Sequence, residues 1–321
     1  MSLSESTPTV AAHGLTRNYG AHLSVGPLDI ELHQGEVLGL LGPNGAGKST
    51  TLRMLTGHLA PSSGEVRIAG IDLLDSPRRA KAHLGYAPEI PPLYRELTVD
   101  EYLGFCARLH RLPAGKLRPA REQAKARCGL MEVGGRLIGH LSKGYQQRLG
   151  IAQAILHEPD VIILDEPTAG LDPNQMREVR ALIRELGQRH SVILSSHILP
   201  EVEAVCDRVL ILHRGRVVFH DRVEALKHPA TSAGLILGCK RPPPLETLRE
   251  LPGITAVERQ RDGLFRLGLK PGAEVEETLC RLAVENDWGL FRLCPEHTTL
   301  EDVFVELTRE ETATDPPKQD R

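Results

Sequence analysis

A glycine-rich stretch from Gly42 to Thr50 constrains this chain more than any other feature. It reads Gly-Pro-Asn-Gly-Ala-Gly-Lys-Ser-Thr, it directly follows the apolar run 37–41, and residues 49–55 after it have helical character. Glycines let such a loop turn tightly and aim its backbone N–H groups at phosphate oxygens at the start of a helix. In this pattern Lys48 reaches the β- and γ-phosphates, and the Ser49 hydroxyl binds Mg²⁺. The sequence therefore predicts a nucleotide-binding loop made of Gly42, Pro43, Asn44, Gly45, Ala46, Gly47, Lys48, Ser49 and Thr50.

Size and composition place the chain among ordinary globular proteins that have room for two domains. It has 321 residues, 25% of them charged, and a net charge of −3, so no global field favours nucleic acid and none is expected as a partner. The six cysteines are scattered without metal-binding spacing, which is typical of reduced thiols in a cytoplasmic protein. The N-terminal segment lacks the regions of a signal peptide, and no apolar stretch reaches about 18 residues. We therefore expect a chain that does not cross a membrane by itself.

Alternating strands and helices predict an α/β fold for residues 1–225. Short β-like runs occur at 9–12, 23–32, 37–41, 65–68, 161–164 and 192–194. A largely helical insert at about 98–158 begins with a capping box, Thr98-Val99-Asp100-Glu101, and a further helix begins at Asp172-Pro173. Because helices alternate with buried strands, we expect a parallel sheet covered by helices.

The rest of the chain predicts a smaller α+β domain at residues 226–309. Strands are expected at 234–239, 254–258, 264–269 and 288–293, with helices at 244–251 and 274–285. This order, βαββαβ, is that of the ferredoxin-like split βαβ arrangement. A last helix is expected at 299–309, followed by a disordered polar tail at 310–321. Two roles remain open for this domain, binding of a small regulatory ligand and support of a dimer.

Two carboxylates, Asp165 and Glu166, come directly after the predicted strand 161–164. Ligands of an open parallel sheet gather at the carboxyl ends of its strands, so these acids are expected beside the phosphate loop. Asp165 would hold Mg²⁺ through water, and Glu166 would orient or deprotonate the attacking water.

Residues 141–148 read Leu-Ser-Lys-Gly-Tyr-Gln-Gln-Arg and resemble the signature motif of ABC transporter ATPases. The resemblance implies that Ser142 and the N–H of Gly144 contact the γ-phosphate of ATP bound to a second subunit, helped by a helix N-terminus. Lys143 stands where the motif usually has Gly, and Tyr145 where it has Gln. By itself the octapeptide also fits a capped amphipathic helix; its position before the acidic strand favours the signature motif.

Three further positions resemble the same family, in the order that it requires. Tyr19 is similar to the aromatic residue that stacks on adenine, although an ordinary surface or core tyrosine also fits. Asp172 ends a segment, Ala169-Gly170-Leu171-Asp172, that looks like the loop through which the two nucleotide sites sense each other, and it also fits a plain N-cap. His197 matches the switch histidine that contacts the γ-phosphate and the attacking water.

Glu89 departs from the family pattern. It ends the segment Gly85-Tyr86-Ala87-Pro88-Glu89, in the place of a loop whose Gln usually touches Mg²⁺ and signals to the membrane subunits. A carboxylate binds a hard cation better than an amide does, but it adds negative charge near the γ-phosphate. Our hypothesis is that Glu89 binds Mg²⁺ directly or through water and couples its loop to the partner.

The resemblance covers residues 8 to about 220 and implies a P-loop NTPase fold, the ABC nucleotide-binding domain with its helical insert. It further implies an ATPase with ATP and Mg²⁺ as cofactors, which works as a head-to-tail dimer of two copies. Because transport needs a membrane span, we expect a separate permease as partner and a peripheral location at the cytoplasmic face of the inner (cell) membrane.

Details at 88–89, 142–145 and 300–308 look like the bacterial exporter branch with ABC-2-type permeases, which includes gliding-motility, drug-export and copper-related ATPase subunits. The segment 89–110 is expected to dock on the permease. The rival hypothesis is a soluble ABC-type ATPase of translation or DNA repair. Such proteins typically carry two cassettes or a long coiled coil, and the sequence shows one cassette without heptads.

Overall fold

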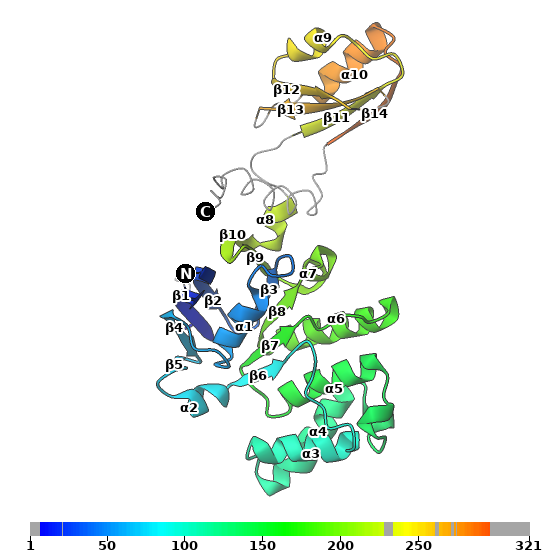
Figure 1. Ribbon diagram of the computed structural model, residues 1–321. Coiled ribbons are helices and arrows are strands. Elements are labelled where there is room, and N and C mark those ends of the chain that lie inside the picture. The colour runs from blue at the N-terminus through cyan, green and yellow to red at the C-terminus, as the bar shows by residue number, and fades with distance from the viewer. Residues whose placement is uncertain are drawn as a thin grey trace, which may run out of the picture. The chain divides into compact units, whose positions relative to one another are not determined.

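The computed structural model describes residues 7–20, 22–227, 234–260, 263–270, 273 and 275–295. The chain divides into two compact units, Met1–Val223 and Glu224–Arg321 (Figure 1). The helix expected at 299–309 and the tail at 310–321 lie outside the described residues.

Two sheets form the framework of the first unit. Its strands are β1 (Val10–Tyr19), β2 (His22–Leu32), β3 (Val37–Leu41), β4 (Ser63–Ile68), β5 (Ile71–Asp72), β6 (Leu84–Ala87), β7 (Val161–Asp165), β8 (Ser191–Ser196), β9 (Arg208–His213) and β10 (Arg216–Arg222). One sheet is antiparallel, with the order β2-β1-β4-β5. The other has the order β10-β9-β3-β8-β7-β6, and all its neighbouring strands are parallel except the edge pair β10–β9. The expected parallel sheet is thus confirmed.

Helices lie between and outside these sheets. They are α1 (Lys48–Leu55), α2 (Pro77–Lys81), α3 (Val99–Leu109), α4 (Ala114–Arg127), α5 (Lys143–Ile155), α6 (Pro173–Gly187) and α7 (Leu199–Val205), with short 3₁₀ turns η1 (Met131–Val133) and η2 (Ile138–His140). Helix α8 (Val223–Lys227) begins at the last residue of this unit and otherwise belongs to the second. Helix α1 packs against β2 and β7, whereas α6 and α7 pack against β8 and α7 also against β3. Since both faces of the parallel sheet are covered, β3, β7 and β8 are buried at every residue.

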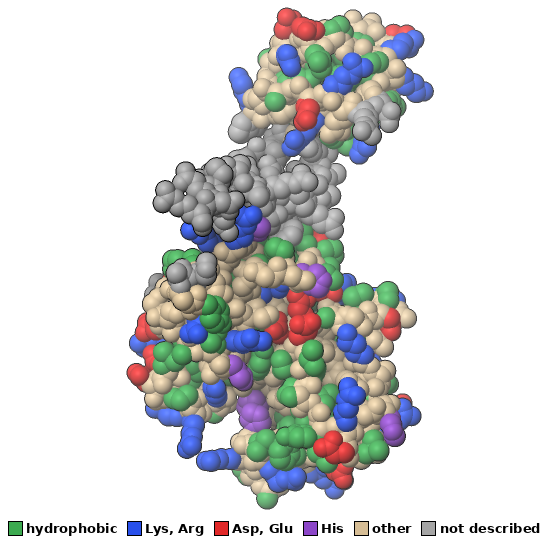
Figure 2. Space-filling model, in the orientation of Figure 1, with side chains coloured by type: hydrophobic (Ala, Val, Ile, Leu, Met, Phe, Trp, Pro, Cys, Tyr) green, Lys and Arg blue, Asp and Glu red, His purple; other side chains and the backbone are tan. Residues whose placement is uncertain are grey.

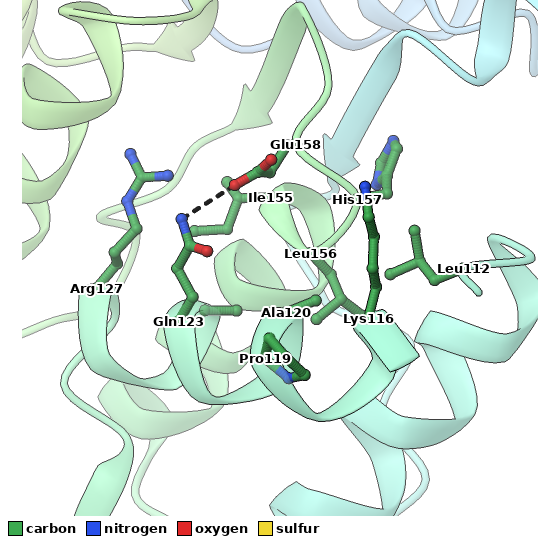
Figure 3. Close-up of a pocket in the computed structure, with 11 residues that line it drawn as sticks. Leu112, Lys116, Pro119, Ala120, Gln123, Arg127, Ile155, Leu156, His157 and Glu158 are labelled. Carbon is green, nitrogen blue, oxygen red and sulfur yellow. Dashed lines mark hydrogen bonds between the residues drawn. The ribbon is translucent and has the colours of Figure 1, made fainter. Parts of the chain in front are cut away.

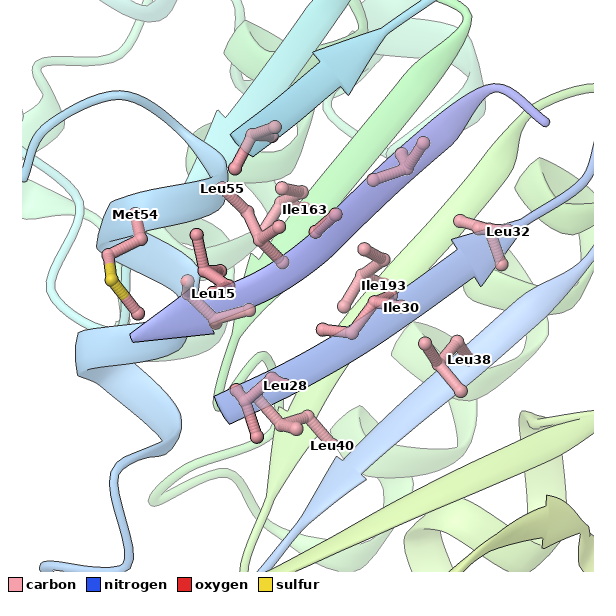
Figure 4. Close-up of a cluster of buried hydrophobic side chains, with 14 of the residues drawn as sticks. Leu15, Leu28, Ile30, Leu32, Leu38, Leu40, Met54, Leu55, Ile163 and Ile193 are labelled. Carbon is pink, nitrogen blue, oxygen red and sulfur yellow. The ribbon is translucent and has the colours of Figure 1, made fainter. Parts of the chain in front are cut away.

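The main core lies between the two sheets (Figure 4). Leu15, Leu28 and Ile30 of the antiparallel sheet are at most 1% exposed, as are Leu40 and Ile163 of the parallel sheet. Helix α1 adds Leu52, Met54 and Leu55 to the same cluster. Burial of each such side chain stabilises the fold by about 1.5–3 kcal/mol, so this core holds α1, and the loop before it, in place.

The helical insert begins as the sequence predicts. The Thr98 hydroxyl accepts a hydrogen bond from the Glu101 N–H at 3.2 Å, and the Glu101 carboxylate accepts one from the Thr98 N–H at 2.8 Å. This reciprocal pair satisfies two N–H groups that the first turn of α3 leaves free. Helices α3, α4 and α5 pack on one another and form the insert.

The segment expected to be a loop at residues 85–89 is partly strand. Leu84–Ala87 forms β6, which pairs with β7 at the edge of the parallel sheet. Gly85 has no room for a side chain, because an added Cβ would lie 2.1 Å from the Ala154 carbonyl oxygen of α5. The loop therefore begins only at Pro88.

The second unit contains one antiparallel sheet of order β12-β13-β11-β14. Its elements are β11 (Gly234–Cys239), α9 (Leu245–Arg249), β12 (Ile254–Arg259), β13 (Leu264–Leu269), α10 (Glu276–Glu285) and β14 (Leu290–Pro295). Both β11 and β12 run antiparallel to β13, so they are parallel to each other with β13 between them, which is the expected split βαβ arrangement. Leu237, Phe265 and Leu279 are fully buried in its core.

The last strand of this unit begins at Leu290 instead of the predicted residue 288. Asp287 and Gly289 have φ values of 52° and 65°, which no strand accommodates. The Trp288 N–H donates to the Ala283 carbonyl at the end of α10, so this residue still belongs to the helix terminus. Within the part of the chain that the structure describes, we find no helix with the length and apolar character needed to cross a membrane.

Candidate nucleotide site

The loop at Gly42–Thr50 connects β3 to α1, and its glycines are required by sterics. Gly47 is the N-cap of α1 with a φ of 107°, a conformation that favours glycine. A Cβ on Gly42 would lie 2.4 Å from the carbonyl oxygen of Leu212. Because α1 begins at Lys48, the N–H groups of its first turn have no partner within the helix and are free to bind an anion.

Lys48 lies at the floor of this loop and is only 6% exposed. Its ammonium donates to the Gly42 carbonyl at 2.7 Å and lies 3.5 Å from the Glu166 carboxylate. A buried cation is stable only when it is paired, and these two contacts supply the pairing. A triphosphate that binds here would compete with Glu166 for the same ammonium.

Glu166 is held in a strained backbone conformation at the end of β7. Its φ is 46°, which is uncommon for a residue with a side chain and typical of functional sites. The Glu166 N–H donates to the Ser195 hydroxyl at 2.9 Å, and the carboxylate lies 2.9 Å from Nδ1 of His197. Ser195 in turn donates to the Asp165 carboxylate at 2.6 Å. The ends of β7 and β8 thus fix the two acids and the histidine together.

These residues surround a cleft with a volume of about 420 Å³. It brings together ten of the predicted site residues: Pro43, Asn44, Gly45, Gly47, Lys48, Ser49, Thr50, Glu89, Glu166 and His197. The other two loop residues face away, since the Gly42 carbonyl is occupied by Lys48 and the Ala46 side chain is buried. Ser24 and Ala169 also line the cleft; Ser24 belongs to no motif, so no sequence signal could have identified it.

Comparison with known proteins identifies the family. The family described as "ABC transporter" matches residues 25–169. A Bacillus subtilis protein described as an uncharacterized ABC transporter ATP-binding protein is 34% identical over 301 residues, which are 93% of this chain and 99% of the relative. The chain belongs to the ATP-binding proteins of ABC transporters.

Two further similarities agree with this assignment. The bacitracin transport ATP-binding protein of Bacillus licheniformis is 34% identical over 91% of this chain and 95% of its own length. A solved structure of an ATP-binding subunit of an ABC transporter superposes with a TM-score of 0.63 at 32% identity, over 68% of this chain and 92% of that one. As an ABC ATPase the chain binds ATP and hydrolyses it, and the hydrolysis is coupled to transport.

The residues of the signature segment do not line the cleft of this ABC ATPase. Ser142 caps α5 by accepting a hydrogen bond from the Tyr145 N–H at 3.4 Å. Gly144 packs against Gln175, whose side chain would lie 2.6 Å from an added Cβ. Asp172 caps α6 by accepting from the N–H groups of Asn174 and Gln175. Ser142 and Asp172 therefore act as helix N-caps. Their contacts with a second subunit stay a prediction.

Tyr19 lies at the end of β1 and is also not among the residues that line the cleft. Its side chain is half-exposed, and the Arg17 guanidinium lies 4.8 Å from the centre of its ring. The structure thus leaves one face of the ring stacked on a cation, and its contact with adenine stays a prediction.

The donors around the cleft fit Mg²⁺. Ser49 and Glu89 line the cleft, and Asp165 is buried at the end of β7 beside it. Hydroxyl and carboxylate oxygens are ligands of this hard cation. No group of three or more His, Cys, Asp or Glu among the described residues is arranged to hold a metal unaided. A magnesium ion would therefore complete its coordination with water and nucleotide phosphates, as it usually does in phosphoryl-transfer sites.

A second cavity of about 280 Å³ lies between α4 and the end of α5, away from the predicted site residues (Figure 3). Gln123 and Glu158 are hydrogen-bonded at 3.0 Å across it, as the dashed line shows. His157 lines it and stacks on His110 with ring centres 3.8 Å apart. Burial, and then the neighbouring His110, lower the pKa of His157 to about 4, so this imidazole is neutral at pH 7.

Proposed function

We propose that this ABC ATPase is a subunit of a bacterial exporter and works as a head-to-tail dimer that encloses two ATP molecules. One observation carries the proposal: the cleft gathers Lys48, Ser49, Glu166 and His197, whereas Ser142 and Gly144 lie on a separate helix start that does not line it. The site that one chain builds is thus half of a composite site. The other half would come from the second copy.

In this proposal each cleft residue has a distinct task. The N–H groups of the loop and the Lys48 ammonium bind the β- and γ-phosphates. Glu166 accepts a proton from the attacking water. His197 is hydrogen-bonded to the Glu166 carboxylate and orients this water toward the γ-phosphate. Ser49, Asp165 and Glu89 hold Mg²⁺, which neutralises charge on the phosphates. Tyr19 stacks on the adenine. From the other subunit, Ser142 and the Gly144 N–H contact the γ-phosphate, and Asp172 lies at the interface.

The dimer would close because ATP favours the closed form. The contacts from the signature segment to the triphosphate exist only when the two subunits meet, so ATP stabilises the closed dimer by differential binding. Hydrolysis removes these contacts and reopens the dimer. This cycle of closure and opening would drive a separate membrane permease.

Export through an ABC-2-type permease, from the cytoplasmic face of the membrane, is supported by a relative and by a surface. The similar Bacillus licheniformis protein is named for bacitracin transport, and the match spans nearly its full length, which favours transport over a role in translation or DNA repair. A cavity of about 240 Å³ on the helical insert has aromatic walls, which include Tyr94, Tyr102 and Phe105.

Hydrophobic side chains also gather over α3 in Figure 2. Leu109 and Ile90 are 65% and 83% exposed, which is costly unless a partner covers them. The segment 89–110 is therefore the proposed docking surface for the permease. This surface and the ATP site share a residue: β6 ends at Ala87, and Glu89, at the start of the segment 89–110, lines the nucleotide cleft.

We further propose that residues 1–225 form the nucleotide-binding domain, with a helical subdomain at 98–158, and that residues 226–309 are an accessory domain that supports the dimer. Its core is closed and apolar, which suits a structural role.

The decisive test is Glu166→Gln. The substitution keeps the shape of the side chain and removes its basicity, so we expect ATP turnover to fall about 10²- to 10⁴-fold while ATP binding persists. Because hydrolysis is then the blocked step, ATP should convert the chain into a lasting dimer, visible by light scattering after gel filtration. Glu203→Gln, at a half-buried position of α7 that does not line the cleft, is the control. Rapid residual hydrolysis, or a chain that stays monomeric with ATP, would refute the proposal.

A further inference from the structure

Lys143 carries a charge that nothing in the described part of its own subunit offsets. It is the first residue of α5, it is exposed, and it has neither an ion pair nor a hydrogen bond from its side chain within the described ranges. The first turn of α5 contains no acidic residue. A cation at this end opposes the helix dipole, so the position is unfavourable for the isolated subunit.

The Lys143 side chain lies against the loop that precedes α6. It rests on Gly170, where an added Cβ would lie 2.2 Å from Nζ. Gly170 belongs to the loop that leads from Glu166 to α6, and the preceding Ala169 lines the nucleotide cleft. The ammonium is therefore presented beside Ser142, on the surface that the proposed dimer turns toward its partner.

Glu89 carries the opposite charge beside the nucleotide site. It follows β6, lines the cleft together with Lys48 and Ser49, and is exposed. Lys48 and His197 both contact Glu166 instead, and no described side chain forms an ion pair with Glu89. A carboxylate here repels the triphosphate that the cleft has to bind, because like charges at short range are unfavourable even when partly screened.

We propose that Lys143 of each subunit forms an ion pair with the partner subunit's Glu89 across the closed ATP site. This inference rests on the proposed head-to-tail dimer, in which the start of α5 covers the partner's cleft. No described side chain of the open subunit pairs with either charge, and closure brings the two together beside the Mg²⁺ that Glu89 is proposed to help hold. Closure also excludes water, which strengthens the attraction between the two groups.

The pair gives closure an electrostatic contribution that does not depend on the phosphates alone. Without Lys143, the closed site would hold Glu89, Glu166 and the triphosphate with one positive charge fewer to offset them.

The experiment compares two mixed dimers that contain the same substitutions in different arrangements. All chains are full length and carry Glu166→Gln, and a donor dye on one chain and an acceptor dye on the other report mixed dimers by energy transfer in ATP and Mg²⁺. The first mixture joins a Lys143→Gln chain to a Glu89→Gln chain, so one site keeps its pair and the other has neither charge. The second joins a Lys143→Gln, Glu89→Gln chain to a chain with both residues intact, so each site has a single unpaired charge.

Pairing between subunits predicts that the first mixed dimer is about tenfold tighter than the second, a difference of the size that close charge pairs show at interfaces. Raising the salt concentration should narrow the gap. Equal affinities would overturn the pair and leave the dimer standing, and a tighter second mixture would place the pair within one subunit and overturn it as well. If the reference chains, substituted only at Glu166, show no ATP-dependent dimer, the proposed function fails, and the pair fails with it.

Discussion

The nucleotide cleft and the signature segment belong to the same unit but differ in burial and in how their charges are paired. In the cleft, Lys48 and Glu166 are both less than a tenth exposed, and each has its partner within the chain. At the signature segment, Ser142 and Lys143 are exposed at the start of α5, and the lysine has no partner among the described residues. A buried charge needs a partner within its own chain, whereas an exposed charge is stabilised by water until a ligand or a second copy binds. The comparison therefore distinguishes the cleft, which binds ATP within one chain, from the signature segment, which is proposed to contact ATP bound to the second copy.

The strongest test of this difference compares two buried lysines. Lys48→Met should weaken ATP binding at least about 30-fold, because a buried cation that contacts phosphate is lost and Glu166 keeps a charge without its partner. Lys125→Met is the matched control: Lys125 is equally buried and pairs with Asp100 at 2.6 Å in the helical insert. It should lower the free energy of unfolding and leave ATP affinity unchanged. Titration of a fluorescent ATP analogue into each variant measures its ATP affinity, and urea unfolding measures its free energy of unfolding. Equal losses of affinity would mean that the cleft is not the binding site.

A second test compares two N-caps that have the same local chemistry. Ser142→Ala and Thr98→Ala each remove a hydroxyl that accepts a hydrogen bond from the third residue of a helix, so each should lower the free energy of unfolding by about 1 kcal/mol. Only Ser142→Ala should also weaken ATP-dependent dimerisation, by about tenfold, since it removes a contact to the partner's nucleotide.

The ATP affinity of the monomer should be the same in both variants, because neither hydroxyl lines the cleft. Sedimentation equilibrium of each variant in the Glu166→Gln background measures the dimer. If both variants dimerise equally well, Ser142 is a cap and nothing more.

The smallest effect on ATP binding and dimerisation is expected from the far end of α5, which should act on stability alone. Burial lowers the pKa of His157 from 6.5 to about 4. Between these values the unfolded chain binds a proton that the folded chain does not, so stability rises with pH over this window and is lost as the pH falls from about 6.5 to 4. Between pH 7.5 and 5 the effect on the free energy of unfolding is about 2 kcal/mol, since one pKa unit corresponds to about 1.4 kcal/mol.

His157→Gln should remove part of this pH dependence. Urea unfolding followed by circular dichroism at pH 7.5 and 5 measures it, with His140→Gln, at an exposed position, as the control. An unchanged pH dependence in His157→Gln would show that the histidine is not kept neutral by the fold.

Much of the fold follows from local patterns. The capping box at Thr98, the cap and proline at Asp172-Pro173 and the strands 37–41, 234–239 and 264–269 all have the bounds that the sequence predicts. Other elements escaped prediction. Strand β6 has only four residues, too few to show a period, and β10 lies at a sheet edge, where half-buried residues leave no clear alternation.

The candidate site likewise contains residues that local patterns predicted and residues that they did not. The residues of the loop at Gly42–Thr50 act through local backbone geometry, so their type and order were sufficient to predict a phosphate site. That Asp165 and Glu166 would lie beside it followed from a general rule for parallel sheets. No pattern could show that Ser195 holds both acids, or that Ser24 lines the cleft, because these residues come from distant strands and belong to no motif.

The sequence by itself determined which groups this protein has for binding ATP and where its helices begin, since turns, caps and glycine sterics depend on neighbours in the chain. Only the tertiary structure decided that Lys48 is buried against Glu166, that His197 reaches the same carboxylate, and that Lys143 and Glu89 have no partner of their own among the described residues. The reason is physical: burial and charge pairing depend on segments that the packing of two sheets brings together, and no local pattern encodes which segments those are.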